Sequence, residues 1–264
     1  MQTIDFQGKR LAFHKEGKGK TPVVFIHGFC EDHRMWDEFI EPFNGRYIIR
    51  IDLPGFGNSE VPDEHSISHM SESVNAVLMH LKIKKCIFVG HSMGGYVSLE
   101  FAKKYPEKLS GLCMFHTHPF ADSEEKKAGR QKQIDFISRN GHILYVRQVI
   151  PSLFAYDFSK GFPFEVNKLI YNAAKFPSEG IIAALEAMRD RPDNSDVLKN
   201  IDCPVQFIIG KKDIAVSLEQ SLAQVHLPKV ADIQIDEDVG HIGMFEAKSR
   251  TTKALKQFLR FVEN

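Results

Sequence analysis

Residues 90–94 read Gly-His-Ser-Met-Gly, which fits the pattern G-x-S-x-G. An apolar run precedes this pentapeptide, and a segment with helical spacing follows it and stops before Pro106. This context predicts a sharp turn from a strand into a helix with Ser92 at its tip, whereas the pentapeptide alone would also fit an ordinary glycine-rich turn. The N–H groups and the positive dipole end of the following helix favour a developing oxyanion. The segment therefore indicates acyl-transfer chemistry with Ser92 as nucleophile.

The elements that would hold such a serine are visible in the hydrophobic pattern. Several short runs are almost continuously apolar and β-branched, which is typical of parallel strands buried on both faces; they are residues 22–28, 47–52, 86–90, 109–115 and 204–210. Residues 4–14 look like a small hairpin, and residues 231–236 like a last strand. Helical spacing is found at residues 66–81, 94–105, 217–226 and 248–262. This alternation predicts a doubly wound, mostly parallel sheet with helices on both faces.

One long stretch, from Thr117 to Asn200, contains no convincing strand and reads as several helices, among them residues 123–139, 142–152 and 178–189. We therefore expect a core formed by residues 1–116 and 201–264, with a helical cap or lid at residues 117–200. Aromatic side chains cluster in one short part of this stretch, at Phe154, Tyr156, Phe158, Phe162 and Phe164. They fit either a packed hinge between cap helices or a wall of the substrate pocket.

These features together resemble the α/β-hydrolase superfamily, in particular its small cytosolic esterase, lactonase and perhydrolase-like members. The segments that carry the resemblance span nearly the whole chain in family order; they are residues 24–29, 52–59, 90–95, 210–213 and 240–241. The resemblance implies the α/β-hydrolase fold, with about eight strands in a mostly parallel, doubly wound sheet and a helical cap inserted after strand 6. It also implies an oxyanion hole made by the backbone N–H groups of Phe29 and Met93.

A serine hydroxyl needs a neighbouring base, and the chain has twelve histidines from which to choose. His241 follows Gly240 after the last expected strand, on a loop at the carboxyl ends of the strands, where ligands bind in open α/β sheets. Asp213 follows the preceding strand, and the order Ser92, Asp213, His241 matches the order of the fold. We predict these three residues as the catalytic triad.

Other carboxylates remain as alternatives for the acid. Asp236 and Asp238 are closer to His241 in sequence, although triad members meet in space rather than along the chain. Asp122 follows the sixth expected strand, a position from which some members of the family take their acid.

Substrate-binding residues are predicted at the cap entrance. His116 and His118 flank Thr117 at the end of the sixth strand, and Phe154 and Phe158 belong to the aromatic cluster; we expect these four side chains to line the pocket. The two histidines could in principle form a metal pair, but no carboxylate or cysteine lies beside them at ligand spacing. We therefore expect no metal and no cofactor.

Composition narrows the class of partner. The chain has 264 residues with 34 basic and 34 acidic side chains, so its formal net charge is zero. A neutral protein has no long-range field with which to collect nucleic acid or an anionic membrane. The four cysteines form no C-x-x-C pair, and the N-terminus lacks the pattern of a signal peptide. These features lead us to expect a cytoplasmic enzyme, a monomer or simple homodimer, acting on a small molecule.

The expected reaction is hydrolysis of a carboxylic ester through an acyl-enzyme intermediate, or of a related lactone or thioester. Serine rather than aspartate at position 92 argues against haloalkane dehalogenase and epoxide hydrolase chemistry. The same triad would also serve perhydrolysis or the hydrolysis of a C–C bond, since substrate choice depends on the pocket. A different class of function, a small-molecule sensor that retains the triad and turns over slowly, remains open.

Overall fold

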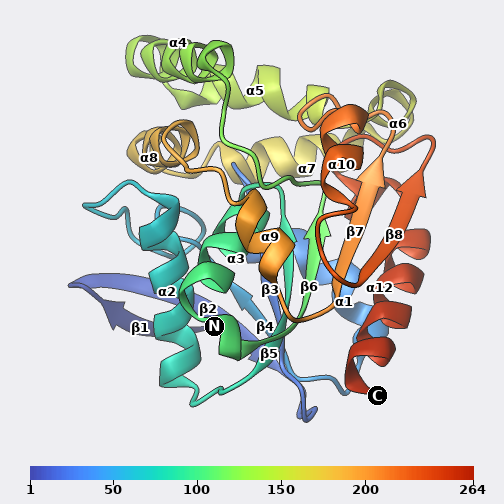
Figure 1. Cartoon of the computed structure of the whole chain (residues 1–264). Coiled ribbons are helices and arrows are strands. Elements are labelled where there is room, and N and C mark those ends of the chain that lie inside the picture. The colour runs from blue at the N-terminus through green and yellow to red at the C-terminus, as the bar shows by residue number, and fades with distance from the viewer.

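A computed structural model describes all of residues 1–264 (Figure 1). Its centre is one eight-stranded sheet with the order β1-β2-β4-β3-β5-β6-β7-β8. The strands are β1 (Gln2–Phe6), β2 (Lys9–Glu16), β3 (Val23–Ile26), β4 (Ile48–Ile51), β5 (Cys86–His91), β6 (Leu109–Phe115), β7 (Val205–Gly210) and β8 (Ala231–Asp236). Strand β2 runs antiparallel to β1 and β4, and every other neighbouring pair is parallel. The predicted sheet, including the N-terminal hairpin, is confirmed.

The central strands are apolar because both of their faces are covered. All residues of β3, β5 and β7 are buried. Helices α2 (Ile67–His80) and α3 (Met93–Lys104) cover one face, and α12 (Lys248–Glu263) covers the other at the β6–β8 side (Figure 1). Three short helices complete the body: α1 (Asp37–Ile40), α10 (Leu218–Gln224) and α11 (Gly243–Glu246). No helix combines the length and the hydropathy needed to cross a bilayer.

Six helices and no strand lie between β6 and β7. They are α4 (Glu124–Asn140), α5 (His142–Leu153), α6 (Tyr156–Gly161), α7 (Pro163–Ala173), α8 (Ser178–Arg189) and α9 (Ser195–Asn200). Figure 1 shows α4, α5, α7 and α8 as a layer above the carboxyl ends of the strands, whereas α9 packs against α3 in the body. The layer formed by α4–α8 roofs the edge of the sheet where Ser92 lies. A separate cap unit with boundaries at 117 and 200 stays a prediction.

The roof shares its hydrophobic core with the body. A single cluster of buried apolar side chains includes Trp36 and Phe115 beneath the sheet edge and extends to Tyr145 of α5 and Leu185 of α8. Because one continuous core joins the two layers, the side chains of the roof have fixed positions relative to the strand ends.

Candidate active site

Ser92 occupies the turn between β5 and α3 in a strained backbone conformation. Its φ is 51° and its ψ is −115°, a backbone conformation that residues other than glycine rarely adopt. Its backbone is held at both ends: the N–H donates to the Phe115 carbonyl at 3.0 Å, and the carbonyl accepts from Thr117 Oγ1 at 2.8 Å. These bonds keep the hydroxyl at the tip of the turn, as the pentapeptide predicts.

The glycines on either side of Ser92 are required by close packing. A Cβ atom on Gly90 would lie 2.5 Å from Ser98 Oγ, and one on Gly94 would overlap the carbonyl oxygens of Ile26 and His27. Strand β3 therefore passes directly against the turn that carries the serine.

The structure joins Ser92, His241 and Asp213 in one chain of hydrogen bonds. Ser92 Oγ lies 2.8 Å from His241 Nε2, and His241 Nδ1 lies 2.7 Å from Asp213 Oδ2. The other carboxylate oxygen of Asp213 accepts from the backbone N–H groups of Ala215 at 2.8 Å and Val216 at 2.9 Å. The three residues come from the turns after β5, β7 and β8, so the sheet brings together side chains that are far apart in sequence.

Asp213 is ionised at neutral pH. Burial by itself would raise its pKa, but the charge of His241 and the hydrogen bonds from His116 and His241 outweigh burial and hold the pKa of Asp213 well below its usual range. A carboxylate at this position accepts the Nδ1–H of His241, so the unprotonated Nε2 faces the Ser92 hydroxyl.

The loop that carries His241 is fixed from two sides. Its backbone N–H donates to the Leu153 carbonyl at 2.7 Å, and its carbonyl accepts from His91 Nε2 at 2.9 Å. Leu153 is the last residue of α5 in the roof, whereas His91 is the last residue of β5 in the body. The imidazole of His241 is thus held between the roof and the sheet.

Glu246 strengthens the same junction. Its carboxylate accepts from the N–H groups of Gly240 at 2.9 Å, Ala155 at 2.9 Å and Ile242 at 3.0 Å. One half-buried side chain therefore satisfies backbone donors in both the His241 loop and the segment that follows α5.

Two backbone amides near Ser92 are available for an anion. The N–H of Phe29 donates to no protein acceptor, and a Cβ atom on the preceding Gly28 would lie 3.1 Å from Ser92 Cβ. Met93 is the first residue of α3, and the first N–H groups of a helix have no acceptor within it. The turn after β3 and the start of α3 thus lie on either side of the serine.

Glu31 braces this region and was not singled out from the sequence. Its Oε2 accepts from the Gly28 N–H at 2.6 Å and lies 2.9 Å from His91 Nδ1. Burial would lower the pKa of His91, but the charge of Glu31 outweighs burial and raises the pKa of His91. Glu31 thereby connects the turn after β3, here called the Phe29 turn, to His91, whose side chain holds the His241 loop. The sequence offered no signal for this role beyond a carboxylate shortly after residues 27–29.

Ser92 opens into a cavity of about 310 Å³ under the roof, a volume suited to a small molecule. The apolar part of its wall includes Phe29, Tyr96, Tyr145, Leu153, Met188 and Val216. Helix α4 adds three polar side chains to the wall, Lys126, Arg130 and Gln133. Pattern arguments could not identify them, because they depend on how α4 rotates above the serine.

The two histidines predicted to line this cavity do not do so. His116 lies behind Asp213, with its Nδ1 3.5 Å from Asp213 Oδ2, and burial lowers the pKa of His116 to about 4. His118 stacks on Phe120 and lies behind Tyr96, with its Nε2 3.4 Å from the Tyr96 hydroxyl. Both side chains are buried in the body, since the chain turns under the roof at this point.

The prediction is also wrong for Phe154 and Phe158, which lie outside the cavity lining. Phe154 stacks on Phe158 with 5.5 Å between ring centroids, and Phe158 stacks on Phe162 at 4.6 Å. The stack also contacts Phe245 of α11. These contacts agree with the alternative interpretation of the aromatic cluster, a packed junction between helices.

The alternative acids are engaged elsewhere. Asp236 and Asp238 both pair with Arg250. Asp122 pairs with Arg130 and Arg191 beside the roof. None of the three contacts His241, so Asp213 is the carboxylate that the structure places against it.

One cluster has the spacing of a metal site, with ligand atoms of Asp32, His33 and Asp52 within 4.8 Å of one another. These atoms already have partners within the protein. The Asp32 carboxylate pairs with Arg34, and Asp52 Oδ1 accepts from His33 Nδ1 at 2.7 Å. The Asp52 carboxylate therefore joins the segment that carries His33 to the turn after β4, and the cluster has a structural explanation.

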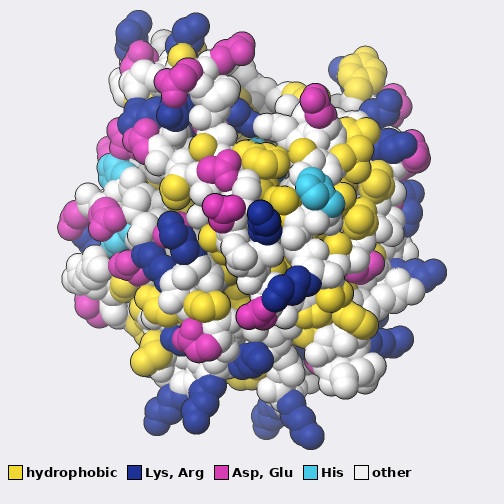
Figure 2. Space-filling view, in the orientation of Figure 1, with side chains coloured by type: hydrophobic (Ala, Val, Ile, Leu, Met, Phe, Trp, Pro, Cys, Tyr) yellow, Lys and Arg dark blue, Asp and Glu magenta, His cyan; other side chains and the backbone are white.

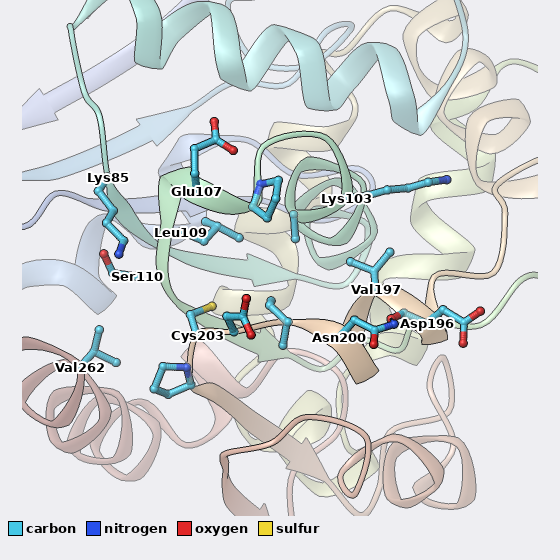
Figure 3. Close-up of a pocket in the computed structure, with 15 residues that line it drawn as sticks. Lys85, Lys103, Glu107, Leu109, Ser110, Asp196, Val197, Asn200, Cys203 and Val262 are labelled. Carbon is cyan, nitrogen blue, oxygen red and sulfur yellow. The ribbon is translucent and has the colours of Figure 1, made fainter.

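A larger groove of about 900 Å³ lies at the opposite edge of the sheet, near the amino ends of β6 and β7 (Figure 3). Figure 3 shows its charged side chains, among them Lys85, Lys103 and Asp196, on different sides of the groove. No hydrogen-bonded nucleophile and base occur there, and burial raises the pKa of the Cys203 thiol to about 11, which keeps it protonated. The groove therefore offers no arrangement suited to nucleophilic catalysis.

A mostly parallel eight-stranded sheet with a serine at a strained strand-to-helix turn defines the class of α/β-hydrolases. A family model described as "alpha/beta hydrolase fold" matches residues 21–139. A thermophilic esterase from Thermogutta terrifontis, solved with malate bound, has 30% identity and a TM-score of 0.94, with 100% of both chains covered. The chain belongs to the α/β-hydrolase family.

Two further relatives show the range of the family. An enol-lactonase from Burkholderia xenovorans LB400 has the same fold, with a TM-score of 0.91, 22% identity and coverage of 98% of this chain and 100% of that chain. A 2-succinyl-6-hydroxy-2,4-cyclohexadiene-1-carboxylate synthase from Salmonella newport is 28% identical over 94% of this chain and 98% of its own length. The names thus include esterase, lactonase and synthase, and the esterase and lactonase neighbours support a hydrolase.

Proposed function

We propose that this protein cleaves a carboxylic ester, or a related lactone or thioester, of a small molecule through an acyl-enzyme intermediate. The observation that carries the proposal is the hydrogen-bonded chain from Ser92 through His241 to Asp213, at the wall of a small cavity. Each member of the chain has the hydrogen-bonded neighbour that nucleophilic catalysis needs.

In the acylation step, Ser92 Oγ attacks the carbonyl carbon of the ester while His241 Nε2 takes the hydroxyl proton. Asp213 stabilises the imidazolium that forms. The backbone N–H groups of Phe29 and Met93 stabilise the negative charge on the carbonyl oxygen. When the tetrahedral intermediate collapses, His241 gives its proton to the leaving alkoxide, and the acyl group stays on Ser92.

In the deacylation step, a water molecule replaces the alcohol. His241 takes a proton from this water as the hydroxide attacks the acyl carbon, and it then returns the proton to Ser92 Oγ. This step releases the carboxylic acid and regenerates the free enzyme, so one cycle consumes the ester and one water molecule.

The decisive experiment is labelling with a neutral alkyl fluorophosphonate, followed by mass spectrometry of the intact protein and its peptides. We expect stoichiometric labelling at Ser92, none in Ser92→Ala, and labelling slower by about a thousandfold or more in His241→Ala, because the hydroxyl then lacks its base. Ser152 also lines the cavity, so Ser152→Ala is the matched control and should label at the wild-type rate.

Labelling at another residue, or equal rates in wild type and His241→Ala, would contradict the proposal. Turnover of short-chain p-nitrophenyl esters then separates an enzyme from a slow sensor. An enzyme releases nitrophenol far beyond one equivalent, whereas a sensor stops after a single acylation.

A further inference from the structure

Lys126 is a cation in the cavity at Ser92 without a carboxylate partner. It lies in the first turns of α4 and is half-buried. Its Nζ donates one hydrogen bond, to the Ala215 carbonyl at 3.2 Å, and takes part in no ion pair. An ammonium group has three N–H donors, so part of its hydrogen-bonding capacity is open to a ligand.

Arg130 lies one helical turn further along α4 and lines the same cavity. Its side chain is only 12% exposed. Only its Nε donates to a protein acceptor, the Asp122 carboxylate, so both terminal nitrogens of the guanidinium are without partners. A guanidinium in this state is suited to bind a carboxylate through paired N–H donors.

The charges beside the roof do not balance. Lys126, Arg130 and Arg191 are three cations, and the Asp122 carboxylate, which pairs with both arginines, is the one anion among them. Of the remaining carboxylates, Glu31 pairs with His91, and Asp213 lies behind His241 outside the cavity wall. A surplus of positive charge therefore remains at the α4 end of the cavity.

This surplus is local. The whole chain has a formal net charge of zero, and on the face shown in Figure 2 acidic and basic side chains are interspersed. Burial, and next the neighbouring Arg130, lower the pKa of Lys126, so an anion placed beside it would stabilise its charge.

We propose that the substrate is an ester carrying a carboxylate group, which Lys126 and Arg130 bind while Ser92 attacks the ester carbonyl. This inference rests on the proposed function and specifies its substrate class. The cavity volume of about 310 Å³ limits the substrate to a small molecule with the two groups only a few bonds apart.

Two p-nitrophenyl esters test the inference. The pentanoate ester and the monoester of glutaric acid have acyl chains of the same length and differ in whether the chain ends in a methyl group or a carboxylate. For the wild type we expect kcat/KM to be about tenfold or more higher for the glutarate ester, the effect of one or two charge-assisted hydrogen bonds. In Lys126→Met this ratio should fall by about tenfold, mainly through a higher KM for the glutarate ester.

Lys127 supplies the matched control. It neighbours Lys126 but pairs with Glu124 on the solvent side and lies outside the cavity lining. Lys127→Met should keep the wild-type ratio, and Lys126→Arg should retain most of it because the positive charge is kept. A ratio that falls equally in both methionine variants would overturn the inference, since surface charge would then be its cause.

A second measurement does not depend on turnover. Free glutarate should slow the labelling of Ser92 by the neutral fluorophosphonate in the wild type, and should do so much less in Lys126→Met. No preference for the glutarate ester and no protection by glutarate would overturn the inference, while Ser92-dependent cleavage of the pentanoate ester would leave the proposed function standing. Loss of labelling at Ser92 itself would contradict both.

Discussion

Both carboxylate oxygens of Asp213 are held by hydrogen bonds from the protein. One carboxylate oxygen accepts from two backbone N–H groups, and the other accepts from His241 and lies near His116. These contacts fix both the position and the charge of the carboxylate without any substrate. The tautomer of His241 is therefore set by the protein itself.

Asp213→Asn tests this role at the scale of a single residue. The asparagine amide would direct a donor or a weaker acceptor at Nδ1, so the imidazole would favour the wrong tautomer. We expect kcat for ester hydrolysis to fall by about a thousandfold to ten-thousandfold with little change in stability. Asp238→Asn, which alters an exposed partner of Arg250, is the control and should retain full activity. A loss below about tenfold in Asp213→Asn would assign the acid elsewhere.

Residue types and order were sufficient to predict that Ser92, Asp213 and His241 lie together, because each follows a strand and so must lie at the same edge of the sheet. The same reasoning failed for His116 and Phe158, since it placed residues near the roof without fixing which way their side chains point. Lys126 was missed for the same reason. Its place in the cavity wall depends on the rotation of α4 above Ser92, which packing with α5 and α8 determines.

At the scale of elements, the turns around the site brace one another. Asp52, directly after β4, accepts from the N–H of His33 at 2.9 Å, from His33 Nδ1 at 2.7 Å and from the Asn58 N–H at 2.9 Å. The short helix η1 (His33–Trp36) is thereby tied to the turn after β4. His27 adds a second tie, since its Nε2 accepts from the Leu53 N–H at 2.9 Å. The Phe29 turn is thus anchored on both sides.

The pH dependence of stability reports on this brace. Burial would raise the pKa of Asp52, but hydrogen bonds and the charge of His33 outweigh burial and lower it from 3.8 to about 2. Because the folded-state pKa is depressed, the stabilisation is fully present above about pH 4 and is lost as the pH falls toward 2. The shift corresponds to about 2 kcal/mol.

Urea unfolding of the wild type and Asp52→Asn should therefore show a difference near that value at about pH 7, narrowing steadily below about pH 4. The exposed Asp63 pairs with Lys9 on the surface, so Asp63→Asn should match the wild type throughout. A difference between wild type and Asp52→Asn that does not change with pH would contradict the assignment.

Helices were predicted most accurately from the sequence where the helical spacing of apolar residues repeats over several turns. The spacing of apolar residues placed α2, α4, α8 and α12 within a residue or two of their observed ends. It missed α1, α6, α7, α9 and α11. Four of these helices have only four to six residues, too few for a helical period to repeat, and α7 begins inside the aromatic segment that Pro and Gly residues interrupt.

At the scale of the whole molecule, a net charge of zero together with a cationic cavity predicts that kcat/KM depends only weakly on salt concentration. A protein with a strong net field loses substrate attraction steeply as salt screens it, whereas charges inside a cavity are screened less. Between about 0.02 and 0.5 M NaCl, kcat/KM of the wild type for the glutarate ester should fall only about two- to fivefold, and that for the pentanoate ester should stay nearly constant. A fall of about a hundredfold for the glutarate ester would instead indicate steering by the whole surface.

The contact between the roof and the His241 loop limits which segments of this protein can be exchanged with those of a relative. The Leu153 carbonyl and the Ala155 amide hold the His241 loop directly or through Glu246. The roof therefore cannot be exchanged as an independent module with that of a relative. A chimera that replaces residues 117–200 would introduce a new pocket wall and, in the same step, remove part of the support of His241. Retaining residues 153–155 together with Glu246 would change the pocket wall and keep that support.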